Sequence, residues 1–190
     1  MLLLGVIEQI PISQHSPGDL EIDLALVGAL GDDHLNNIAQ SHGWSLVLGQ
    51  DSSPARLEKG GRQIQVRRQG FTSVLLGSDL LLCMAGTAAE QAVGMAKPVL
   101  QLPGQGPQFT AGFAEAQRRL LGPTVFCAAA PYEGEELLRE TAKLAVELLE
   151  RSVNDPDLRR DCRKQAMQRL GPQGGGSKMA GLISGLLQKS

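Results

Sequence analysis

Aromatic side chains are scarce in this sequence: Phe, Trp and Tyr make up 3% of its 190 residues. Proteins that bind single-stranded nucleic acids stack bases on such side chains, and nucleic-acid-binding domains are usually basic. The low aromatic content and the formal net charge of −2 therefore argue against nucleic-acid binding. Long apolar runs are also missing, and none approaches the roughly 20 residues that a membrane-spanning helix needs.

Cysteine is sparse as well, and the three cysteines lie far apart in the sequence, at Cys83, Cys127 and Cys162. This spacing matches neither a metal site nor a disulfide framework. We therefore expect reduced structural cysteines in a cytoplasmic protein, and no bound metal. The opening "MLLLGVIEQIP" is apolar, but it contains Glu8 and lacks the basic start of a signal peptide.

Glycine, in contrast, is abundant, with 23 residues placed between short apolar runs. The middle of the sequence alternates predicted strands with predicted helices. We expect strands at 79–86, 97–104 and 123–130, and helices at 71–78, 87–96, 107–122 and 132–151. Short apolar strands that alternate with helices form parallel sheets covered on both faces. The sequence therefore predicts an α/β fold with a Rossmann-like parallel sheet.

The flanking parts of the sequence are less regular. Ahead of this core we expect a helix at 2–10, strands at 21–30, 44–49 and 62–68, and a loop at 52–61. Asp32 or Asp33 is expected to cap a helix that ends near Gly43, because adjacent acids at a helix start act more often as caps than as metal ligands. Towards the carboxyl end, Asp155 is predicted to cap a helix that begins with Pro156, and Ser177 a last one.

Two glycine-containing turns follow neighbouring predicted strands, at Gly86 and in "PGQGPQ" at 103–108. The carboxyl ends of parallel strands share one edge of a sheet, and ligands of such folds bind there. Free amides at a helix start favour phosphate, so Gly86, Thr87 and Ala88 are candidates for a diphosphate site, with Glu90 close enough for a ribose. The alternative is a Thr87–Glu90 capping box without a ligand.

The second turn offers Gln105 and Gln108, whose amides can donate to and accept from sugar hydroxyls. Its alternative is a plain turn with two exposed amides. No Ser–His–Asp or Cys–His arrangement is visible in the sequence, and "GGGSK" at 174–178 has the wrong order and no preceding strand for a phosphate loop.

The segment "SDLLLCMAGTAAEQAVGMAKPVLQLP" at 78–103 resembles the nucleotide-sugar half of UDP-sugar glycosyltransferases with the GT-B fold. It is similar to lipid A disaccharide synthase and to the murein UDP-N-acetylglucosamine transferase. The longer segment at 84–123 is closer still to a group of lipid-A-disaccharide-synthase-related proteins. The resemblance is specific across 71–130, and "GPQGGGSKMAGLI" at 171–183 looks like the closing glycine turn and last helix of these enzymes.

This resemblance implies roles for individual residues. Gly86, Thr87 and Ala88 would contact the diphosphate, and a carboxylate in the next helix would bind the ribose. Glu90 is the first candidate for that carboxylate, although the matching position of lipid A disaccharide synthase falls on Gln91. The remaining implied contacts are the uracil segment at Gly70 and Phe71 and the sugar loop at Gly104, Gln105, Gly106 and Gln108.

The resemblance also implies a function. The chain would be the donor half of an enzyme that transfers a hexosamine-type sugar from a UDP-sugar, its donor substrate, to a lipid or sugar acceptor, with no separate cofactor. Residues 1–190 would form one GT-B carboxyl-terminal-like domain that begins after the family's first strand. The helices at 155–190 would pack back toward the absent amino-terminal domain, which carries the acceptor site and the base.

Three expectations follow for the isolated chain. It should be inactive, because the base that activates the acceptor lies outside it. A separate amino-terminal half is an expected partner. A lipid acceptor implies peripheral contact with the inner membrane. Two other functions stay open: an enzyme like UDP-GlcNAc 2-epimerase, and a non-catalytic nucleotide-binding remnant of a glycosyltransferase.

Overall fold

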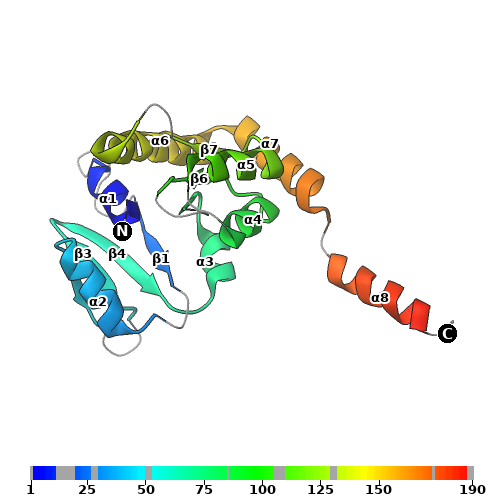
Figure 1. Cartoon of the computed structure of the whole chain (residues 1–190), viewed down its shortest axis with the longest axis horizontal. Helices are drawn as coiled ribbons and strands as arrows, with labels where there is room; N and C mark the ends of the chain where they lie inside the picture. Colours follow the sequence, from blue (N-terminus) through cyan, green and yellow to red (C-terminus); the bar gives the residue numbers. More distant parts are fainter. Residues whose placement is uncertain are drawn as a thin grey trace.

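The computed structural model of the chain describes residues 2–11, 20–26, 30–49, 53–84, 86–104, 110–128, 132–172 and 174–187. The strands form two sheets, sheet A with four described strands and sheet B with three. Helices pack around both sheets, and the last helix extends away from the rest of the molecule (Figure 1).

Sheet A contains β1 (Asp23–Ala25), β2 (Ser45–Val47), β3 (Arg56–Lys59) and β4 (Arg62–Arg67). The strand order is β1-β4-β3-β2, with β1 parallel to β4 and the other two pairs antiparallel. The prediction of a loop at 52–61 is therefore wrong for the β3 residues. Gly60 and Gly61 have φ angles of +55° and +81°, the backbone that a two-residue hairpin turn between β3 and β4 requires.

Helices α1 (Leu2–Gln9) and α2 (Asp32–Ser41) cover one face of sheet A. Trp44 is 1% exposed and lies in a shared core with residues of both helices, such as Leu4 and Leu35. The N-cap position of α2 is Gly31, one residue earlier than predicted, and Asp32 instead pairs with Arg68.

Sheet B contains β5 (Leu81–Cys83), β6 (Val99–Gln101) and β7 (Val125–Cys127), all parallel and in that order. Helices α4 (Thr87–Gly94) and α5 (Ala111–Leu121) connect them, and α3 (Phe71–Gly77) precedes β5. Alternate strand residues point to opposite faces of a sheet. Val99 accordingly packs in the cluster with α4 and α5 residues, whereas Leu100 packs against the next helix, α6 (Gly134–Asn154).

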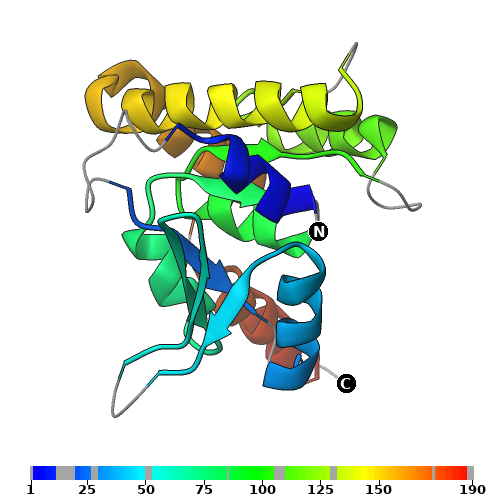
Figure 2. The ribbon, with the colours of Figure 1, turned by 90° about the vertical axis from the view of Figure 1, so that its left-hand side faces the viewer.

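The second face of sheet B is covered by α6 together with α1, which lie against each other (Figure 2). Sheet B is thus a Rossmann-like parallel sheet with helices on both faces, and the predicted α/β class is confirmed. Sheet A adds an antiparallel part that the sequence analysis did not predict.

The carboxyl-terminal helices differ in how they pack. Asp155 accepts hydrogen bonds from the amides of Asp157 at 2.9 Å and Leu158 at 3.2 Å, which confirms it as the N-cap of α7 (Pro156–Gln165). A π-helical turn, η2 (Ala166–Leu170), continues α7, and both pack against α4. The last helix, α8 (Gly175–Leu187), begins two residues before Ser177, so the predicted cap lies inside the helix.

Candidate functional site

The candidate site lies at the carboxyl edge of sheet B, where Gly86 follows β5 and Gly104 follows β6. Gly86 is the N-cap residue of α4, with φ +90° and ψ −159°, a conformation that only glycine adopts readily. A Cβ placed on Gly86 would meet no atom of the described residues within 4 Å. The turn therefore requires glycine because of its dihedral angles, and not because of crowding by the described residues.

The amide of Gly86 is not free, in contrast to the prediction. It donates a hydrogen bond of 3.3 Å to Oε1 of Gln117, on α5. The same oxygen accepts a hydrogen bond from Nε2 of Gln101, at the end of β6. Gln117 therefore connects the first glycine turn to the neighbouring strand, and the amides that remain for a ligand are those of the first α4 residues, Thr87 and Ala88.

Gln101 and Gln117 are 0% and 8% exposed. The other side-chain oxygen of Gln101, Oε1, has no hydrogen-bond partner in the described part of the chain. Neither residue was predicted from the sequence to be part of the site. The sequence feature that could have indicated Gln101 is its place within the otherwise apolar run "VLQL". A glutamine in such a run becomes buried on folding and then needs a polar partner.

The α4 residues predicted to bind a ligand share one side of the helix. Thr87, Glu90 and Gln91 are three and four residues apart, the spacing that places side chains on one helix face. Thr87 and Gln91 are exposed and Glu90 is half-buried. The N-cap residue of α4 is Gly86, which has no side chain to cap with, and not Thr87, so the alternative of a Thr87–Glu90 capping box is wrong. Glu90 forms no ion pair with any residue that the structure describes.

The other predicted contacts are only partly placed. Gly70 has φ +76° and caps α3, which begins with Phe71. Phe71 packs against the buried cluster that contains Cys83 and residues of α4, so the structure brings the predicted uracil segment and α4 onto one core. Gly104 is half-buried after β6. The predicted sugar contacts Gln105, Gly106 and Gln108 lie outside the described residues.

The thiols near this edge are held in their neutral form. Burial raises the pKa of Cys83 to about 12, and burial, followed by the charge of Glu115, raises that of Cys127 to about 11. Neither thiol is a thiolate at neutral pH, so neither is an activated nucleophile. The described histidines, His34 and His42, lie on α2 and at its end, on sheet A.

The carboxylate of Glu115 on α5 pairs with Arg118 and Arg119. Hydrogen bonds from Arg118 and Arg119 lower the pKa of Glu115 on the surface of α5 to about 2. Among the described residues no group of His, Cys, Asp and Glu is arranged to hold a metal ion. What the candidate site presents is a set of hydrogen-bonding groups: helix amides, the Thr87 hydroxyl and the Glu90 carboxylate.

None of the helices in the described ranges combines the length and the apolar character needed to cross a bilayer.

No known protein family matches the sequence, and no curated protein matches it. Among the solved structures, the chain is similar to the glycotransferase of kitacinnamycin, at 16% sequence identity and a TM-score of 0.49. The match covers 90% of this chain and 44% of that one, so the chain spans less than half of that protein. The fold class follows from the strand order and the helix layers described above.

Proposed function

We propose that the chain is the donor-binding half of a glycosyltransferase, resembling lipid A disaccharide synthase, and that it holds a UDP-sugar at the carboxyl edge of sheet B. The observation that carries this proposal is the Gly86 turn. It joins a parallel strand to the start of α4, adopts a glycine-only conformation and has no atom of the described residues within 4 Å of a Cβ placed on it. Such turns allow a diphosphate to approach the backbone at a helix amino end.

In this proposal the first α4 amides and the helix dipole bind the diphosphate, with the Thr87 hydroxyl as a further donor. Glu90, one turn along the exposed side of α4, accepts from the ribose hydroxyls. Gln117 holds the turn itself in place through the Gly86 amide. These groups would also stabilise the charge that develops on the departing UDP, which is one of the two requirements of inverting sugar transfer.

The other requirement is a base for the acceptor hydroxyl. We assign no described residue of the edge to this role: in this proposal the helix amides and the Thr87 hydroxyl bind the diphosphate, Glu90 is assigned to the ribose, and the thiols of Cys83 and Cys127 are neutral. The finer parts of the proposal follow the resemblance: a hexosamine-type donor, a lipid or sugar acceptor, and a separate amino-terminal half as partner. A lipid acceptor would bring the assembled enzyme to a membrane surface.

Calorimetric titration with UDP tests the proposal. We expect saturable binding that Gly86→Ala weakens at least tenfold, because a side chain at this φ forces the turn to change shape. Gly60→Ala is a matched control: Gly60 also has a positive φ and open surroundings, but it lies in the sheet A hairpin. Its UDP affinity should equal that of the unchanged chain.

Two further titrations separate the parts of the site. Glu90→Ala should weaken UDP binding but leave pyrophosphate binding unchanged, because Glu90 is assigned to the ribose alone. Absence of heat at millimolar UDP contradicts the proposal and favours a non-binding remnant. Release of UDP from UDP-N-acetylglucosamine in the presence of acceptor, by this chain alone, contradicts the assignment of the base to a separate half.

A further inference from the structure

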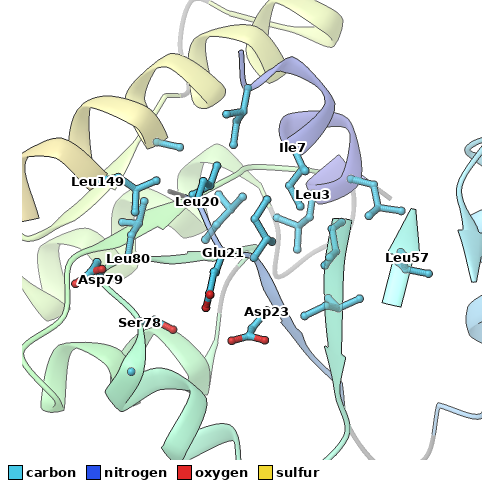
Figure 3. A pocket seen from close by; sticks show the side chains of 18 of the residues that line it. Leu3, Ile7, Leu20, Glu21, Asp23, Leu57, Ser78, Asp79, Leu80 and Leu149 are labelled. Carbon is cyan, nitrogen blue, oxygen red and sulfur yellow. The ribbon is translucent and has the colours of Figure 1, made fainter. Parts of the chain in front are cut away.

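A cavity of about 740 Å³ lies between the two sheets (Figure 3), and Gly86 is not among the residues that line it. Leu3 and Ile7 of α1, Leu57 of β3, Leu80 beside β5 and Leu149 of α6 all line it. Protein interiors are close-packed and leave few voids larger than a water molecule. An apolar space of this size, lined from several elements of the fold, therefore indicates that a folded segment belongs there.

Two strand edges border this cavity. β1 is at the end of sheet A and pairs only with β4, and β5 is at the end of sheet B and pairs only with β6, among the described strands. Residues of both strands line the cavity, including Leu24 and Leu82. Unpaired edges of this kind are templates for pairing with another strand.

The backbone groups that face the cavity can be identified from the existing ladders. Hydrogen bonds to β4 use Ile22 and Leu26, whereas bonds to β6 use Leu81 and Cys83. Alternate residues of a strand direct their amide and carbonyl to opposite neighbours. The amides and carbonyls of the intervening residues therefore point away from β4 and β6, toward the cavity side. These residues are Asp23 and Ala25 of β1, Leu82 of β5 and Leu80 just before it.

We propose that this cavity is a receptor for one extended strand of a second polypeptide, which pairs with β1 and β5 at the same time and joins the two sheets into one. In a strand that is covered on both faces, each residue occupies roughly 160 Å³. This volume is the product of a rise of about 3.3 Å per residue, a strand spacing of about 4.8 Å and a layer spacing of about 10 Å. The cavity thus has room for four to five residues at about that volume.

The lining and the edges together define the chemistry of the strand. Its side chains are apolar on both faces, because leucines and isoleucines of both layers contact the space. Its backbone supplies the donors and acceptors that the two edges need, which a lipid or a small apolar molecule does not. This mode of binding is strand addition, in which main-chain hydrogen bonds provide affinity and side-chain pockets provide selectivity.

Charge at the cavity entrance gives the strand a direction. Glu21 and Asp23 lie at the amino end of β1, and Asp79 precedes β5; in Figure 3 their carboxylates lie along one side of the cavity. Asp23 pairs with Arg67 at 2.6 Å, whereas Glu21 and Asp79 are exposed and form no ion pair within the described chain. Each edge strand runs parallel to the strand that it pairs with, β1 to β4 and β5 to β6. A strand parallel to β1 and β5 would therefore carry its basic residues at its amino end.

This inference goes beyond the proposed function, because it uses neither the Gly86 turn nor a nucleotide. It is tested with a synthetic peptide, acetyl-Lys-Lys-Val-Leu-Val-Ile-Gly-amide, added to the full chain. We expect saturable binding and slower hydrogen exchange in both the β1 and β5 segments. A peptide with the lysine pair moved to the carboxyl end should bind more weakly, because its parallel alignment brings the charges to the wrong side.

Backbone variants test the pairing directly. N-methylation of the peptide's central leucine removes one main-chain donor and should weaken binding about five- to tenfold, the effect of one net hydrogen bond. In the protein, Ala25→Pro removes a donor on the cavity side of β1, and an edge strand tolerates proline there. A similar loss is expected, whereas Ala25→Ser keeps the amide and should bind normally. If Ala25→Pro does not fold, the N-methylated peptide still decides the question.

Several results would overturn the inference. One is absence of peptide binding, and another is protection of only one of the two strands. Equal affinity for the N-methylated peptide would show that the main chain does not pair. A concentration-dependent dimer that excludes the peptide would make a second copy of this chain the occupant. Binding of UDP has no bearing on these outcomes, so the two proposals can fail separately.

Discussion

Replacing Gln117 by leucine removes the acceptor that connects the Gly86 turn to β6. Two donors lose their partner: the Gly86 amide and Nε2 of Gln101. Gln101 is 0% exposed, so water cannot replace the lost bond. A buried unsatisfied donor costs about 1–3 kcal/mol, and the half-exposed Gly86 amide adds less. We expect Gln117→Leu to lower the free energy of unfolding by about 2–4 kcal/mol.

The double variant gives a sharper test. Gln101→Leu alone removes a side chain whose Oε1 is already unpaired, and Gln117 keeps its bond to Gly86. We expect this change to alter the unfolding free energy by less than about 1 kcal/mol, because only one net hydrogen bond is lost and the buried, unpaired Oε1 of Gln101 is removed. With both residues leucine, the only donor left unpaired is the Gly86 amide. The double variant should therefore be more stable than Gln117→Leu, a non-additive result.

The measurement is urea unfolding, followed by the fluorescence of the single tryptophan and by far-UV circular dichroism. Coincident transitions are needed to convert midpoints into free energies. The reasoning is refuted if Gln117→Leu is as stable as the unchanged chain, or if the double variant loses the sum of the two single effects. Either result means that the three groups do not form the buried connection described above.

Three further outcomes are expected. Hydrogen bonds from the Leu158 and Asp157 amides lower the pKa of Asp155 in the folded chain. The contribution of Asp155 to stability is therefore present above the ordinary pKa of 3.8 and is lost as the pH falls through the folded pKa. Asp155→Ala should lower Tm at pH 7 but have a smaller effect in acid. Glu8→Ala leaves the buried Trp44 indole without its 2.7 Å acceptor and should cost about 1–3 kcal/mol by urea unfolding, whereas Glu8→Gln should cost less. Thiol titration of the native chain at pH 8 should be slow, with Cys83, whose pKa is raised to about 12 by burial, reacting only on unfolding.

Most of the elements could be predicted from local patterns. The end of α2 near Gly43, the N-cap at Asp155 and the strand–helix alternation after residue 71 depend on neighbours in sequence, so single-sequence reasoning can find them. The β3 strand was missed because its residues, "RLEK", are mostly charged. Pairing with β4 through the glycine turn stabilises it, and that pairing outweighs the weak strand preference of the residues.

The candidate site was predicted in outline only. Gly86 was identified from its place between an apolar run and a helix, and its φ of +90° confirms that glycine is required there. That its amide is already bonded to Gln117, 31 positions away, follows from how α5 lies across sheet B. No local pattern carries that information.

The sequence by itself determined the α/β class, the glycine turn after β5 and the helix that begins there, because these follow from hydrophobic periodicity and from the backbone freedom of glycine. The tertiary structure decided that the strands form two sheets instead of one, that Gln101 and Gln117 meet beneath the turn, and that β1 and β5 border an apolar cavity. Strand neighbours and buried polar pairs are chosen by contacts between distant residues, and those contacts exist only once the chain has folded.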